Sequence, residues 1–334
     1  MIQPSFGDLA QRLQLQRLGT GMRTDMKRLL REVTTGQVAD PGTALRGDHA
    51  RLSALDTARG RSQAHVQAAQ ELAGHLGLMQ RTLDRVSEPL VDLSTTLLTA
   101  SQTGDTVRLS QAGRATRAAF EDTVAALNTQ LAGRSLFAGA RTDGPALADP
   151  DTLMDALVGS LDPTATPADM VAAVDAWFAG GGGFDGGFLG TAAPEAPITL
   201  ASGQQIRLDV TAEDPAFRGL LAGLALGALA QGDAPALDRA TRQALAEASG
   251  LRLLAANAAV ITVAETVGQA EARVEAARVA AETEGTALDV ARAGLLDADP
   301  YAAAARLDEL MAQLDTLYTV TARSSRLSLT EYLR

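Results

Sequence analysis

The sequence predicts a mainly α-helical fold: a long antiparallel helical bundle or coiled coil built from both chain ends, with an inserted small mixed α/β or β-rich domain. Apolar residues recur at steps of three and four through roughly the first 135 residues and again after about residue 235, which is the period of an amphipathic helix. Prolines and glycines gather between these regions. Only 3% of the 334 residues are aromatic, so we expect many small helix-to-helix contacts and not one thick core.

The N-terminal region divides into an assembly segment, residues 1–43, and the first bundle helices, residues 44–138. A long helix is expected from about Ala44 to Glu88, and Pro89 kinks or ends it because proline lacks the backbone donor. A polar break at residues 101–105 predicts a turn before a second, antiparallel helix. The two apolar stripes are Val66, Ala69, Leu72, Leu76, Met79, Leu83, Val86 and Leu90, and then Leu109, Gly113, Thr116, Phe120, Val124, Leu127 and Leu131.

Residues 139–234 form the expected inserted variable domain. They hold seven prolines and a glycine cluster at 180–187. Ile198 and Leu200 alternate with polar residues, and the same alternation returns from Ile206 to Val210. The Ser-Gly pair at 202–203 lies between these runs and has the composition of a turn, so the segment predicts a β-hairpin.

The C-terminal region predicts two further helices. Residues 235–298 are expected to form the long C-terminal helix of the bundle, and residues 299–334 a C-terminal assembly helix, with Asp299-Pro300 as the break. The last helix places Leu307, Leu310, Leu314 and Leu317 on an a/d seam that continues less regularly to Leu327.

Charge and composition exclude several functional classes. The net charge is −11, which disfavours nucleic acid because phosphate contacts need clustered cations. Residues 1–31 carry six basic and two acidic groups, and we interpret these cations as the solvated face of an amphipathic helix. No apolar run reaches the 18 residues that a membrane span needs, and no cleavable signal pattern opens the chain. We therefore expect no membrane insertion.

No residue constellation predicts catalysis, a cofactor site or a metal site. The chain has no cysteine. His65 and His75 are too far apart along one helix to share a metal, and His49 is more distant still. The glycine cluster lacks the Lys-Ser or Lys-Thr pair of a phosphate loop. We expect a protein that is not an enzyme and that uses no cofactor.

The terminal segments are the candidate functional surface. Each is a short amphipathic stretch that is unable to bury its own apolar stripe, so pairing with each other and with neighbouring subunits would complete their core. The candidate assembly and partner-binding residues are Leu9, Leu13, Met22, Met26, Leu29, Leu307, Leu310, Leu314, Leu317 and Leu327.

Three stretches resemble the bacterial flagellin family. Leu127-Asn128, followed by the run from Gly133 to Thr142, is similar to the signature that ends the family's N-terminal helices, with Gly133, Arg134, Phe137 and Gly139 as its turn. The run Glu32-Val33-Thr34-Thr35-Gly36 resembles an earlier family turn, and residues 310–333 resemble the closing helix. The likeness covers residues 1–142 and 235–334.

Within the family, the chain is more similar to the subunits that join hook to filament than to filament flagellin. The resemblance implies an extracellular flagellar location, reached through the flagellar type III system without cleavage of a signal peptide. It also implies the partners: other copies of the chain, a neighbouring junction protein and flagellin, and an export chaperone on the C-terminal helix.

Two alternatives remain open at this point. One is filament flagellin itself, which occupies another position in the same structure. The other belongs to a different class: a coiled-coil interaction module of the cytosol, whose apolar stripes bind partner helices.

Overall fold

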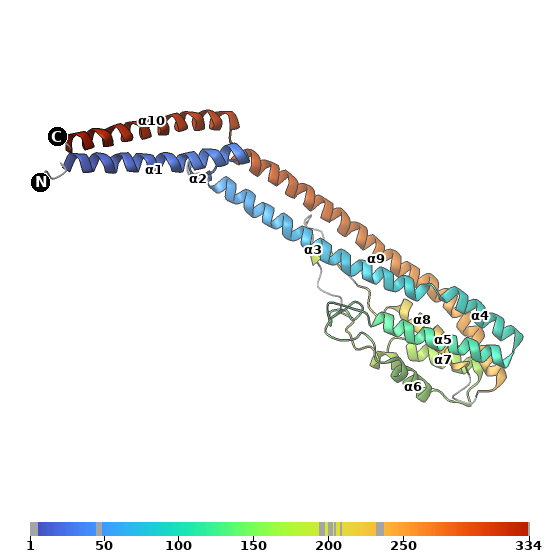
Figure 1. Cartoon of the computed structure of the whole chain (residues 1–334). Coiled ribbons are helices and arrows are strands. Elements are labelled where there is room, and N and C mark those ends of the chain that lie inside the picture. Colours follow the sequence, from blue (N-terminus) through green and yellow to red (C-terminus); the bar gives the residue numbers. More distant parts are fainter. Residues whose placement is uncertain are drawn as a thin grey trace. The chain divides into compact units, whose positions relative to one another are not determined.

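The structure is a computed structural model that describes residues 6–44, 49–193, 198–199, 203, 205–207, 209–231 and 237–332. The chain forms two compact units. Unit 1 comprises residues 1–63 and 282–334, and unit 2 comprises residues 64–281. Two long helices, α3 (Ala50–Ser87) and α9 (Arg239–Leu296), contribute to both units (Figure 1).

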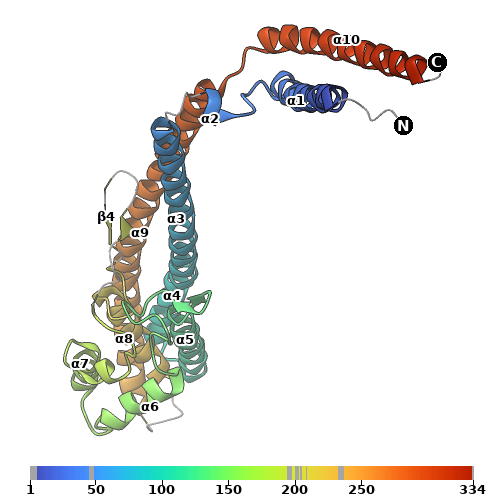
Figure 2. The same ribbon diagram turned by 90° about the vertical axis from the view of Figure 1, so that its left-hand side faces the viewer.

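Unit 1 pairs helices from opposite ends of the chain. Helix α1 (Phe6–Thr35) lies beside α10 (Pro300–Tyr332), as both views show (Figures 1 and 2). A short helix, α2 (Pro41–Ala44), follows α1. The unit also contains the first part of α3 and the last part of α9, which two ion pairs join: Arg59 Nε lies 2.5 Å from Asp289 Oδ1, and Arg292 Nε donates to Asp56 Oδ1 at 2.8 Å.

Unit 2 is a helical bundle with short two-stranded ribbons. Its remaining helices are α4 (Leu90–Thr103), α5 (Thr106–Leu127), α6 (Pro150–Ser160), α7 (Pro167–Phe178), the 3₁₀ helix η1 (Gly183–Gly186) and α8 (Pro215–Leu229). Strands β1 (Gln130–Leu131) and β2 (Arg134–Ser135) form one antiparallel ribbon. Strands β3 (Ile198–Thr199) and β4 (Gln205–Ile206) form another, with Ile198 opposite Ile206.

Helix α8 lies at the centre of unit 2. From Leu220 to Leu229 every residue is buried, which fits a helix that is apolar on all sides. Two glycines allow its neighbours to approach closely: a Cβ at Gly227 would lie 2.6 Å from Thr116 Cγ2 of α5, and a Cβ at Gly223 would lie 3.1 Å from Leu253 Cδ2 of α9. The bundle core therefore forms around a segment from the middle of the sequence.

Local sequence signals explain where several helices begin. Asp105 accepts hydrogen bonds from the backbone N–H groups of Val107 and Arg108 at the start of α5. Asp149, Thr166 and Asp214 cap α6, α7 and α8 in the same way, and each is followed directly by proline at the first helical position. Proline is tolerated there because its missing N–H would have had no helical partner.

The mainly helical fold is confirmed, and most helix boundaries lie within about six residues of the expected ones. Leu131 was expected on the second helical stripe, but α5 ends at Leu127, and Leu131 lies in β1 with 38% exposure. The first long helix ends at Ser87, the turn after α4 falls at Gly104, and α9 ends at Leu296. The expected hairpin is present as β3 and β4, although Leu200 and Leu208 lie outside the described residues. The middle region differs in one respect, since α6, α7 and α8 make the described part of it mainly helical and not β-rich.

Candidate assembly site

The two terminal helices form an antiparallel pair with one shared seam. Near the base of the pair, Ala298 N–H donates to Gly36 C=O at 3.0 Å and Val38 N–H donates to Leu296 C=O at 2.9 Å. Further along, Arg23 Nε donates to the Tyr318 hydroxyl at 3.1 Å. Because residue numbers rise along α1 as they fall along α10, these contacts fix the antiparallel direction and the register.

Small and apolar side chains meet along this seam. Leu29 of α1 and Leu314 of α10 are buried. Gly19 lies opposite Leu317, so closely that a Cβ at Gly19 would be 3.3 Å from Leu317 Cδ2. The Arg23 guanidinium also lies 5.8 Å from the centroid of the Tyr318 ring, a cation–π distance that helps to hold the register.

The seam is only half closed by the two helices. Five of the ten residues proposed for assembly are half-buried in the pair: Met22, Met26, Leu307, Leu310 and Leu317. Other apolar side chains of the pair are exposed, namely Leu18, Leu30, Met311 and Val320. Two helices are able to enclose a seam from two sides only, and half-buried seam residues gain further burial when a third or fourth helix joins them.

Leu13 lies away from the seam. Nine residues at about 100° each turn Leu13 to the side of α1 opposite Met22, and its side chain is 52% exposed. Leu9 and Leu327 belong to α1 and α10, and their side chains lie outside the described part of the structure. The structure therefore brings seven of the proposed residues to one seam and places Leu13 on another surface.

The signature turn lies in unit 2 and has a packing role. Gly133 turns the β1–β2 ribbon with a φ of 79°, a left-handed conformation that favours glycine. Phe137 is fully buried, and its ring meets Phe217 of α8 edge to face with the centroids 5.8 Å apart. Gly139 has a φ of 66°, and a Cβ there would collide with the Thr191 carbonyl. Arg134 is exposed. The turn thus anchors the middle segment to the bundle.

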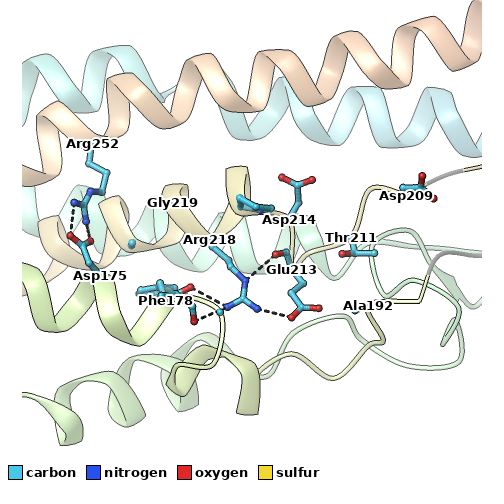
Figure 3. A pocket seen from close by; sticks show the side chains of 14 residues that line it. Asp175, Phe178, Ala192, Asp209, Thr211, Glu213, Asp214, Arg218, Gly219 and Arg252 are labelled. Atoms are coloured by element: carbon cyan, nitrogen blue, oxygen red, sulfur yellow. Dashed lines mark hydrogen bonds and ion pairs between the residues drawn. The ribbon is translucent and has the colours of Figure 1, made fainter.

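One cavity of unit 2 is built around a buried arginine that the sequence analysis did not single out. Arg218 of α8 lines a cavity of about 650 Å³, and Figure 3 shows its guanidinium between Glu213 and the Phe178 carbonyl. It donates to Asp185 Oδ1 at 2.6 Å, to Glu213 Oε1 at 2.7 Å and to Phe178 C=O at 3.0 Å. It also lies 4.9 Å from the centroid of the Phe184 ring.

Both arginines of this cavity are paired with carboxylates. The hydrogen bond from Arg218, reinforced by the backbone N–H of Gly181, lowers the pKa of Asp185. Arg252 pairs with Asp175 (Figure 3), and burial lowers the pKa of Arg252. Neither histidine nor cysteine is among the residues that line the cavity, and the described residues include no group of three acidic or histidine side chains able to hold a metal. The hydrogen bonds from Arg218 hold the loop after α7 against α8.

Fold and site together define a mainly helical protein whose candidate functional surface is a half-closed helix seam. Residues 253–333 match the family model described as the bacterial flagellin C-terminal helical region. That range covers most of α9 and all of α10. The match supports assignment of the chain to the bacterial flagellin family, and this assignment supports a role as a structural subunit of the flagellum. A search of curated proteins finds no significant match.

Proposed function

We propose that this chain is the structural subunit that joins hook to filament in the bacterial flagellum, most like the flagellar hook-associated protein 3. The flagellin match on α9 and α10 carries the flagellar part of the proposal, and the junction position rests on the sequence resemblance to the subunits that join hook to filament. The matched region includes α10, and several apolar seam residues of α10 are only half-buried. The region that resembles flagellin is therefore also a region without a complete core.

Assembly proceeds by completing that core. Met22 and Met26 of α1 and Leu310 of α10 are half-buried in the isolated subunit. Helices from neighbouring copies cover them, and each side chain that becomes fully buried contributes a fraction of the roughly 1.5–3 kcal/mol of a fully buried large apolar residue. A surface that meets a different surface on the next copy builds an open helical layer. The neighbours are other copies, an adjoining junction protein and flagellin.

Export precedes assembly in this proposal. The chain leaves the cell through the flagellar type III system without cleavage of an N-terminal signal. Before export, a chaperone binds α10 in a groove and covers the apolar side of the helix. That side consists of Leu307, Leu310, Leu314 and Leu317. The final location is extracellular, on the flagellum.

Filament flagellin is the second candidate, because the same C-terminal match supports it equally. The two functions differ in how far assembly proceeds. A junction subunit stops after a short layer, whereas filament flagellin polymerises over the length of the filament. Purified chain that grows into long filaments without any cap would favour filament flagellin.

A deletion strain tests the proposed function. Cells without the gene should keep their hooks, lose their filaments and release flagellin monomer into the medium. A wild-type copy should restore the filaments. Leu314→Asp, which places a charge on the buried seam, should fail to restore them, whereas Ala312→Asp, on the exposed side of the same helix, should succeed. Filaments in the deletion strain would contradict the junction role, and equal failure of both variants would contradict the role of the seam.

A further inference from the structure

Helix α9 carries a second apolar face within unit 2. One face is buried in the bundle through Leu253, Ala256 and Val260. The opposite face exposes large apolar side chains, with Leu251 58% exposed, Leu254 44% and Ile261 46%. Although no apolar run is uninterrupted over 18 residues, α9 is by length and composition alone apolar enough to cross a membrane, and only 28% of its most apolar 18-residue stretch is buried. We call Leu251, Leu254, Ala258 and Ile261 the α9 stripe.

The spacing of the α9 stripe is that of a helix-docking surface. Its residues follow one another at steps of three, four and three, so they lie in one row along the helix. Ala258 is exposed between the larger residues. A row of exposed leucine and isoleucine side chains on a soluble unit marks a place where another surface binds.

Two neighbouring hollows lie along α4 and α5, and we call them together the α4–α5 groove. The hollows have volumes of about 460 and 450 Å³ and meet at Ala115. Alanines of α5 form much of its wall, and their short side chains leave depth for larger ones. The lining residues used below are Arg85, Arg108, Ala115, Ala119 and Ala126.

Length and charge match the stripe to the groove. Glu247 and Glu265 flank the stripe on the same side of α9 and are exposed; at 1.5 Å per residue they are about 27 Å apart. The groove runs from Arg108 to Ala126 on α5, also about 27 Å. Arg108 lines one end of the groove, where its Nε also lies 3.8 Å from Asp105 Oδ2, and Arg85 lines the other end together with Asp122. Two carboxylates thus meet two guanidinium groups when the stripe lies along the groove.

We propose that the α9 stripe of one copy docks in the α4–α5 groove of the next copy. Leucine and isoleucine side chains enter the hollows between the alanines, in the manner of knobs entering holes. Stripe and groove are formed by different helices, so each copy offers both and the contact repeats from copy to copy. The inference rests on the proposed function in one respect only, namely that copies of the chain assemble with each other.

The chain contains no cysteine, so introduced thiols are its only thiols. In the full-length double variant Leu254→Cys with Ala115→Cys, one thiol lies at the middle of the stripe and the other where the two hollows meet. A short bismaleimide should join copies into a ladder of dimers, trimers and larger species. Each single-cysteine variant should give at most dimers. A matched control combines Leu254→Cys with Ala172→Cys, which lies on the exposed side of α7.

A ladder from the double variant, and not from the control, supports the contact. Adding Ala119→Arg, which fills the groove with a large charged side chain, should abolish the ladder. Two results would overturn the contact: no ladder over a concentration series, or a control ladder of equal extent. A third result would also overturn the contact: the wild-type chain floats with phosphatidylcholine vesicles and the Leu254→Arg variant does not. The stripe would then bind lipid and not a second copy.

The deletion strain separates this contact from the proposed function. If filaments are lost in the deletion strain but no ladder forms, the flagellar role stands and this contact is wrong. If a ladder forms but the deletion strain keeps its filaments, the contact stands and the junction role is wrong.

Discussion

The substitution Gly227→Ala tests how closely α8 packs in unit 2. A Cβ at this position would lie 2.6 Å from Thr116 Cγ2 and 2.7 Å from Ser249 Oγ. Both neighbours are fully buried. Ser249 Oγ donates to the Gly223 carbonyl at 2.7 Å and so links α9 to α8. The new methyl group must push α8 away from α5 and α9, or displace Ser249 from its hydrogen bond.

Two opposing effects decide the magnitude. Alanine is favoured over glycine in a helix interior by about 1 kcal/mol. Overpacking of a well-filled core costs about 1–3 kcal/mol, and the upper part of that range applies because both clashing atoms are buried and one holds a hydrogen bond. The net loss of unfolding free energy should be about 1–2 kcal/mol.

The fluorescence of Trp177 reports unfolding of unit 2 in urea, because it is the only tryptophan of the chain and it packs against Phe178 with the centroids 4.7 Å apart. Gly219→Ala is the matched control on the same helix, since a Cβ there would meet no atom within 4 Å. The control should be neutral, or more stable by up to about 1 kcal/mol. If Gly227→Ala is as stable as Gly219→Ala, α8 is not packed as described.

Three further predictions concern ion pairs and the terminal seam. Arg218→Ala removes a buried cation whose two carboxylate partners are partly exposed. It should lower the unfolding free energy of unit 2 by about 1.5–3 kcal/mol, the range for a hydrogen bond to a charged group, measured by Trp177 fluorescence in urea. The folded-state pKa of Asp185 is lowered from 3.8, so the carboxylate contributes its full stabilisation above that value and loses it as the pH falls through the lowered pKa. Asp185→Asn should therefore reduce the loss of unfolding free energy at acidic pH. An unchanged dependence on acidic pH would contradict the pairing. Leu314→Ala should weaken the α1–α10 pair by about 2 kcal/mol, seen as faster hydrogen exchange in both helices with no change in the Trp177 transition; equal exchange rates would show that Leu314 is not in the seam.

The sequence predicted those elements whose apolar residues follow one clear period. In the second half of α9, Val267, Val274 and Ala281 are buried on one side of the helix, as their spacing indicated. The proline at position 89 marked the end of α3 correctly because its chemistry is local. The β3–β4 ribbon followed from alternation and turn composition.

Features that depend on the surroundings of a residue were not visible in the sequence. Helix α8 was missed because it is apolar on all sides and therefore has no amphipathic period; its signal was the cap at Asp214 followed by Pro215. Arg218 could not be singled out, since its partner Asp185 lies 33 residues away in the sequence. Leu13 was grouped with the seam although helical geometry turns it to the opposite side of α1.

The central claim is that this chain forms a short layer at one place in the flagellum. Immunogold electron microscopy of isolated flagella, with antibodies raised against the full-length chain and absorbed on cells that lack the gene, tests it most directly. The account predicts gold particles confined to the boundary between hook and filament. Label along the entire filament would contradict the junction role in favour of filament flagellin, and flagella without label would contradict a flagellar role altogether.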